Sequence, residues 1–98
     1  MCGICGVIAF GPSAEPVDVP MLRGMTNAIV HRGPDSDGFF VADDHRVGLG
    51  FRRLSIVDLA TGDQPMSNED DSIWLVFNGE IYNHADHRPV LEARGHRF

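Results

Sequence analysis

The chain has 98 residues, of which 43% are hydrophobic and 22% are charged, a composition typical of one small globular domain rather than of a disordered segment. Its formal net charge is −6 and its 8 cationic side chains are all arginines, which argues against nucleic acid and anionic membranes as main partners. No apolar run approaches the roughly 20 residues of a membrane-spanning helix, and no signal-like segment stands at the N-terminus, so we expect a cytoplasmic protein.

The first half of the chain predicts a strand, a loop, a helix and a β-hairpin. An apolar, partly β-branched run begins just after Cys2 and ends at Gly11, which predicts a buried strand. Pro20 suits the first turn of a helix, and Gly33-Pro34 cannot continue it. Two apolar runs on either side of a polar turn predict the hairpin. In chain order, the expected strand, loop, helix and two hairpin strands span 4–10, 11–19, 20–31, 38–42 and 47–51.

The second half predicts polar loops, one strand and one helix. Its longest apolar run is continuous, which predicts a strand buried on both faces, and this run ends abruptly at Asn78-Gly79. Gly95 would be the C-terminal stop of the helix. In chain order, we expect a strand leading into a loop at 52–58, a polar loop at 61–65, an acidic turn at 69–71, the strand at 73–77, the helix at 85–94 and the start of another strand at 96–98.

The chemistry expected of this chain centres on Cys2, which directly follows Met1. If the methionine is removed, Cys2 carries both a thiol that can attack a carbonyl carbon and a free α-amine. An α-amine has an ordinary pKa of roughly 7.7–8.0 and can accept and return protons near neutral pH. Nucleophile and base then belong to one residue, and no separate histidine is required. The alternative is that Cys2 is simply a small residue at a frayed terminus.

Cys2 and Cys5 form a Cys-x-x-Cys pair that allows several interpretations, although two cysteines this close are not a disulfide framework. A structural zinc site needs four ligands, and His84 and His87 could complete the set only at a spacing unlike that of known zinc knuckles. A redox pair would be expected at a strand-to-helix junction. The sequence favours a small buried Cys5 and histidines on an exposed helix, so we expect no metal site.

Three polar groups could act together with Cys2. Asn78-Gly79 is an ordinary hairpin dipeptide, but after a buried strand its side-chain amide and glycine N–H could also form an oxyanion hole. Arg53 could hold a carboxylate through paired hydrogen bonds, although an isolated arginine more often makes a surface ion pair. Glu80 could hold an ammonium group. Together these are the parts needed to bind an α-amino acid and attack its side-chain amide.

Five motifs occur in order along essentially the whole chain. They are Met1-Cys2-Gly3-Ile4, His31-Arg32-Gly33-Pro34-Asp35, Arg53-Leu54-Ser55-Ile56-Val57-Asp58, Gly62-Asp63-Gln64-Pro65-Met66 and Asn78-Gly79-Glu80-Ile81-Tyr82-Asn83. Together they resemble the N-terminal glutaminase domain of glutamine-hydrolysing asparagine synthetases, which are class II glutamine amidotransferases of the N-terminal-nucleophile hydrolase superfamily. The first motif is shared with other amidotransferases, whereas the third and fifth point to the asparagine synthetase branch.

The resemblance implies a role for each matching residue. Cys2 corresponds to the nucleophile, and Asn78 with Gly79 to the oxyanion hole. Arg53 corresponds to the residue that binds the α-carboxylate of L-glutamine, and Glu80 to a contact with its α-amine. The same pocket would be lined by Leu54, Ser55, Ile56 and Val57. The reaction would pass through a tetrahedral oxyanion and a thioester, with release of ammonia and then of glutamate.

The resemblance also implies a larger parent protein. The family fold is an α+β, four-layer αββα sandwich longer than this chain, so residues 1–98 would be the N-terminal half of a truncated amidotransferase domain. The loop at 32–33 would pack near the site without a catalytic step. A further segment with an S-D-T-E-like sequence is expected after Phe98, followed by a synthetase domain that binds ATP and Mg²⁺. We expect no cofactor in the present segment.

The function implied for the parent is supply of ammonia for ATP-dependent amidation of aspartate to asparagine, in a protein that could be a homodimer. Two alternatives stay open. The acceptor could be a different carboxylate, because the pocket that selects it is not in these residues. The chain by itself could also be an inactive fragment or a binding module, since half a core is a poor basis for stability.

Overall fold

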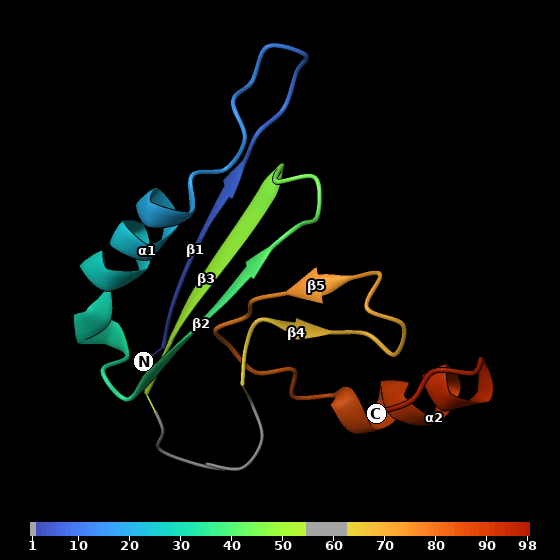
Figure 1. The fold of residues 1–98 in the computed structure, drawn as a ribbon. Coiled ribbons are helices and arrows are strands. Elements are labelled where there is room, and N and C mark those ends of the chain that lie inside the picture. Colours follow the sequence, from blue (N-terminus) through green and yellow to red (C-terminus); the bar gives the residue numbers. More distant parts are fainter. Residues whose placement is uncertain (1, 55–62) are drawn as a thin grey trace.

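The computed structural model describes residues 2–54 and 63–98, which form an α+β fold (Figure 1). The expected fold class is therefore confirmed at the level of α+β. No helix in these residues is long and apolar enough to cross a membrane. In chain order the elements are β1 (Gly3–Ile8), α1 (Val19–Ala28), a 3-10 turn (Val30–Arg32), β2 (Ser36–Val41), β3 (Val47–Arg53), β4 (Met66–Ser67), β5 (Trp74–Leu75) and α2 (His84–Ala93).

The three long strands form one antiparallel sheet in the order β1-β3-β2. β2 and β3 are the predicted hairpin, and β1 pairs with the other edge of β3, with Gly3 opposite Arg52. One further step in this register would place Cys2 opposite Arg53. The sheet thus brings the N-terminus of the chain beside the C-terminal end of β3, as the ribbon in Figure 1 shows.

Helix α1 covers one face of the sheet. Its side chains Leu22 and Thr26 are completely buried, with 0% relative exposure. They lie over Gly48 and Gly50 of β3, where any larger side chain would collide: a Cβ on Gly48 would be 2.9 Å from Val17 Cγ1, and one on Gly50 would overlap the Thr26 hydroxyl. Glycine at these two positions lets the helix approach the strand closely. The helix predicted for this segment is confirmed.

A ribbon of the two short strands β4 and β5 packs on the opposite face. The Phe40 ring of β2 stacks on Trp74 of β5, with 4.4 Å between ring centroids. Gly38 of β2 lies against the backbone carbonyl of Gln64, just before β4, so closely that a Cβ would overlap it. Phe51 is buried between these layers at 3% exposure. The order of layers is therefore helix, sheet and ribbon.

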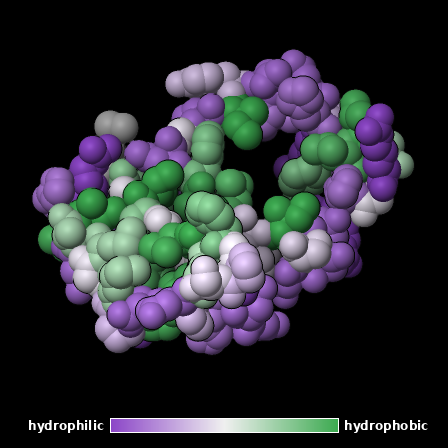
Figure 2. Space-filling view, turned by 90° about the horizontal axis from the view of Figure 1, so that it is seen from above, coloured by the Kyte–Doolittle hydropathy of each residue, from purple (hydrophilic) through white to green (hydrophobic). Residues whose placement is uncertain are grey.

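Two predictions of fully buried strands are wrong. Within 73–77 only Trp74–Leu75 is strand, and the neighbouring Ile73 is 65% exposed. β1 is a strand as predicted, but Ile4 and Ile8 are 47% and 68% exposed. A continuous apolar run is buried on both faces only when layers cover both. Here α1 covers one face of β1, and hydrophobic side chains gather at the surface (Figure 2).

Helix α2 is confirmed within one residue at each end, and Gly95 after it has the left-handed φ of +95° expected of a C-terminal stop. None of its side chains is buried. The last three residues, 96–98, do not form the predicted strand. The radius of gyration is 15.3 Å, against about 13 Å for a compact domain of this length, because α2 projects from the sheet.

Candidate active site

The thiol of Cys2 lies against the backbone just after β3. Leu54 N–H donates a hydrogen bond to Cys2 Sγ at 3.4 Å, and Sγ lies 3.9 Å from the Leu54 carbonyl oxygen. These contacts follow from the pairing of β1 with β3, which aligns the start of one strand with the end of the other. Cys2 is half-buried, so its sulfur is held in place while a substrate can still reach it.

The side chain of Asn78 reaches Cys2 from a position 76 residues away in the chain. Asn78 Nδ2 donates a hydrogen bond to the backbone oxygen of Cys2 at 2.9 Å. An asparagine amide has two N–H donors, so this bond leaves the second one for another acceptor. A pocket of about 190 Å³ is lined by Cys2, Gly3, Ile4, Ile29, Arg32 and Asn78. The structure thus brings together the proposed nucleophile and one proposed oxyanion donor.

The two residues after Asn78 do not line the Cys2 pocket. Gly79 packs against the ring of Phe77, and a Cβ on it would be 2.9 Å from Phe77 Cζ, so a side chain here would push the segment away. Glu80 is exposed and is not among the residues lining the Cys2 pocket. Its contact with a substrate amine stays a prediction.

The side chain of Arg53 is buried at 9% exposure and already holds a carboxylate. Arg53 Nη1 is 2.8 Å from Asp63 Oδ1, and the Asp63 side chain is 84% exposed. The observed pairing ends with Gly3 opposite Arg52, and Arg53 is not among the residues that line the Cys2 pocket, so its contact with a substrate carboxylate stays a prediction. Asp63 was not among the site residues predicted from the sequence. Its position one residue before Gln64 in the fourth motif was the only available signal.

Arg32 lines the Cys2 pocket, which agrees with the expectation that its loop packs near the site. The loop is tied to β3 because Arg52 Nε donates to the Gly33 carbonyl oxygen at 2.8 Å. Gly33 itself packs on the Arg52 backbone, where a Cβ would overlap it. Of the four residues expected to line the substrate pocket, Leu54 contacts Cys2 Sγ through its N–H but is not among the residues that line the Cys2 pocket, and its role stays a prediction. The other three, Ser55, Ile56 and Val57, lie outside the described residues.

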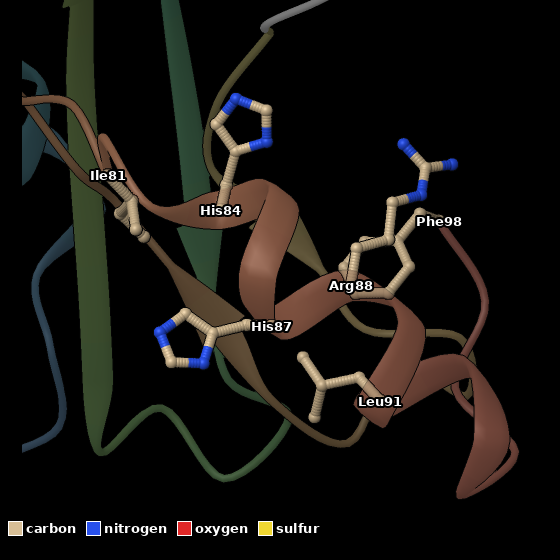
Figure 3. Close-up of a pocket in the computed structure, with 6 residues that line it drawn as sticks. All are labelled: Ile81, His84, His87, Arg88, Leu91 and Phe98. Carbon is tan, nitrogen blue, oxygen red and sulfur yellow. The ribbon is translucent and has the colours of Figure 1, made fainter.

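A second pocket, of about 310 Å³, lies along α2 (Figure 3). It is lined by Ile81, His84, His87, Arg88, Leu91 and Phe98. No cysteine, serine or threonine lines it, and its Arg88 makes an ion pair with Glu92 at 2.9 Å. The α2 pocket offers histidines but no thiol, so the smaller Cys2 pocket is the better candidate for attack by a thiolate on an amide.

The zinc alternative is not supported by the geometry. His84 and His87 line the α2 pocket, whereas Cys2 lines the other one. Within residues 2–54 and 63–98, no group of three His, Cys, Asp or Glu side chains could hold a metal ion. Cys5 Sγ lies 3.3 Å from Thr26 Oγ1 beneath α1, the position of a small packed strand residue.

Comparisons with known proteins agree with the motifs. The family model for the glutamine amidotransferase domain matches residues 1–98. Asparagine synthetase [glutamine-hydrolyzing] 1 of Bacillus subtilis is 52% identical over 100% of this chain and 15% of its own length. Asparagine synthetase [glutamine-hydrolyzing] 2 of the same organism is 46% identical over 93% of this chain and 12% of its own, and a similar protein of Arabidopsis thaliana is 39% identical over 100% and 16%.

No solved structure gives a significant match to the chain. The chain spans about 15% of the length of the first of these relatives and aligns with its N-terminal region. The family match, however, covers every residue from 1 to 98, and over the aligned segments the three relatives are 39% to 52% identical to it. This chain therefore belongs to the glutamine amidotransferase domain family.

Proposed function

We propose that this domain hydrolyses the side-chain amide of L-glutamine, with Cys2 as the nucleophile. The observation that carries the proposal is the 2.9 Å hydrogen bond from Asn78 Nδ2 to Cys2 O. It places an amide donor beside the only thiol that could also carry a free α-amine. A nucleophile, its base and an oxyanion donor within one pocket are the minimum set for acyl transfer from an amide.

The proposed reaction begins after removal of Met1. The α-amine of Cys2 takes the thiol proton, and the sulfur attacks the side-chain carbonyl carbon of glutamine. The negative charge that develops on the carbonyl oxygen is held by the Asn78 amide and the Gly79 N–H. The C–N bond then breaks, and ammonia leaves with the proton from the α-amine. Water hydrolyses the resulting thioester and releases glutamate.

Substrate binding in this proposal uses Arg53 for the α-carboxylate and Glu80 for the α-amine. The Arg53–Asp63 ion pair supports the first assignment, because it means that a carboxylate fits the guanidinium at 2.8 Å. The substrate would take the place of Asp63. Leu54 and residues 55–57 would form the wall of the pocket beside the thiol.

For the natural protein, we propose that the ammonia is used in ATP-dependent conversion of aspartate to asparagine. The support is that the relatives are named glutamine-hydrolysing asparagine synthetases. ATP and Mg²⁺ would in this proposal bind a synthetase domain of the longer protein, and the support is that the chain spans only about 15% of the length of the first relative. The similarity to these relatives is also the support for three further proposals, namely an αββα sandwich, a cytoplasmic location and a homodimer.

The experiment compares Cys2→Ala with Cys5→Ala in the natural protein at its full length. Both substitutions remove a half-buried thiol, that of Cys5 in β1 or that of Cys2 directly before β1. Only Cys2 lines the pocket that Asn78 also lines. Release of glutamate from glutamine should be abolished by Cys2→Ala and retained by Cys5→Ala. Glutamate release by Cys2→Ala at the wild-type rate would disprove the proposed function.

A further inference from the structure

The side-chain amide of Gln64 is bonded twice to the backbone of Phe77. Gln64 Nε2 donates to the Phe77 carbonyl oxygen at 2.9 Å, and the Phe77 N–H donates to Gln64 Oε1 at 2.6 Å. The antiparallel register of β4 and β5 pairs Met66 with Leu75, and two further residues along this register Gln64 lies opposite Phe77. The side chain therefore continues the hydrogen-bond ladder beyond the end of β5.

Phe77 stands directly before the proposed oxyanion residues. Its ring packs under Gly79, at 2.9 Å from where a Cβ would be. The next residue, Asn78, is joined to Cys2 by the hydrogen bond from its side chain. Because β5 ends at Leu75, the ladder bonds of the ribbon do not reach this segment. Among the described contacts, the two bonds from Gln64 fix the backbone of Phe77, which directly precedes Asn78 and Gly79.

The backbone of Gln64 is held firmly in turn. Its carbonyl oxygen packs on Gly38 of β2, in space that any side chain at that position would fill. β2 pairs with β3, and β3 pairs with β1, which follows Cys2. Gln64 therefore links the sheet that carries the thiol to the segment that carries the oxyanion donors. A donor near the reacting oxygen must be placed to within a fraction of an ångström to be effective.

We propose that Gln64 is a positioning residue for glutamine hydrolysis: it clamps Phe77 so that the Asn78 amide and the Gly79 N–H meet the oxyanion beside Cys2. The inference rests on the proposed function, and no substrate contact of Gln64 is needed for it. Loss of the clamp should affect the transition state, in which the oxyanion exists, more than binding of the ground state.

The test uses Gln64→Leu and Gln64→Glu in the natural full-length protein, with Asn68→Leu as the matched control. Asn68 is also half-buried and also bonds the backbone across the same ribbon, since the Ile73 N–H donates to Asn68 Oδ1 at 2.9 Å. It directly follows β4, in the turn that joins β4 to β5, whereas Asn78 follows the other end of β5. Both leucine variants lose side-chain-to-backbone bonds, but only one of them loosens the oxyanion segment.

Gln64→Leu should lower the kcat of glutamine hydrolysis by about 10- to 100-fold and change KM by less than about threefold, whereas Asn68→Leu should leave both within about twofold of wild type. Gln64→Glu keeps the acceptor for Phe77 N–H but sets a carboxylate oxygen against the Phe77 carbonyl oxygen, so its kcat should also fall below that of Asn68→Leu. Equal kcat values for the Gln64→Leu and Asn68→Leu variants, or a change confined to KM, would overturn the proposal.

Hydrogen exchange of the Phe77 amide separates this inference from the proposed function. The exchange should be faster in Gln64→Leu than in wild type and in Asn68→Leu, because the N–H has lost its acceptor. Unchanged exchange would refute the clamp even if hydrolysis is real. Absence of glutamine hydrolysis in the wild type, with faster exchange in Gln64→Leu, would refute the function and leave the clamp as a structural contact without a positioning role.

Discussion

Replacement of Asp63 by asparagine tests whether Arg53 is the site of the substrate carboxylate. In the structure Arg53 Nη1 is 2.8 Å from Asp63 Oδ1, so a substrate carboxylate must displace Asp63 before it can bind. Asp63→Asn keeps the shape of the side chain and removes its charge. The substrate then no longer competes with an internal carboxylate, and the KM for glutamine should fall.

The magnitude follows from the exposure of the pair. The Asp63 side chain is 84% exposed, so water and salt screen its charge even though Arg53 is only 9% exposed. Exposed ion pairs contribute about 0.2–1 kcal/mol, which corresponds to a decrease in KM of about 1.4- to 5-fold at room temperature. The decrease should shrink at high ionic strength, since salt weakens the competing pair in the wild type.

The assay is steady-state glutamate release by the natural full-length protein. Arg53→Lys serves as a control that should change KM in the opposite direction. Lysine cannot make the paired hydrogen bonds of a guanidinium, so Arg53→Lys should raise KM. A higher KM in Asp63→Asn would refute the reasoning, because it would mean that Asp63 supports substrate binding rather than competing with it.

Three further predictions concern the thiol, the oxyanion and an acidic turn. Protein that keeps Met1 should release no glutamate, because the acylated nitrogen of Cys2 cannot act as a base. Mass spectrometry of active protein should show Cys2 as its first residue. Activity with Met1 in place would exclude the mechanism in which the α-amine of Cys2 is the base. Asn78→Ala should lower kcat by about 100- to 1,000-fold with the fold retained, and a loss of folded protein in circular dichroism would instead point to a structural role. The pKa of Asp70 lies below its ordinary value because the side chain and the backbone N–H of Ser72 donate to its carboxylate. These bonds stabilise the turn while Asp70 is ionised and are lost as pH falls through the lowered pKa, so Ser72→Ala should raise the pKa of Asp70 in an NMR titration.

The elements with local signals could be predicted from the amino-acid sequence. The helix α1 follows from Pro20 and its apolar spacing, the β2–β3 hairpin from two apolar runs around a polar turn, and the end of α2 from Gly95. The family also follows from the sequence, because five ordered motifs need no knowledge of packing. Each of these depends on residues that are neighbours in the chain.

The contacts by which distant groups meet, and the burial of apolar residues, depend on how the elements pack in three dimensions. The contacts of Asn78 with Cys2, of Asp63 with Arg53 and of Gln64 with Phe77 depend on strand register and on glycines that allow close approach. The motifs led to the expectation that Asn78 acts together with Cys2, whereas they indicated no partner for Asp63 or Gln64. The exposure of Ile73 likewise could not be predicted from the sequence, because an apolar run is buried only where another layer packs against it. At β5 the described residues supply such a layer on one side only.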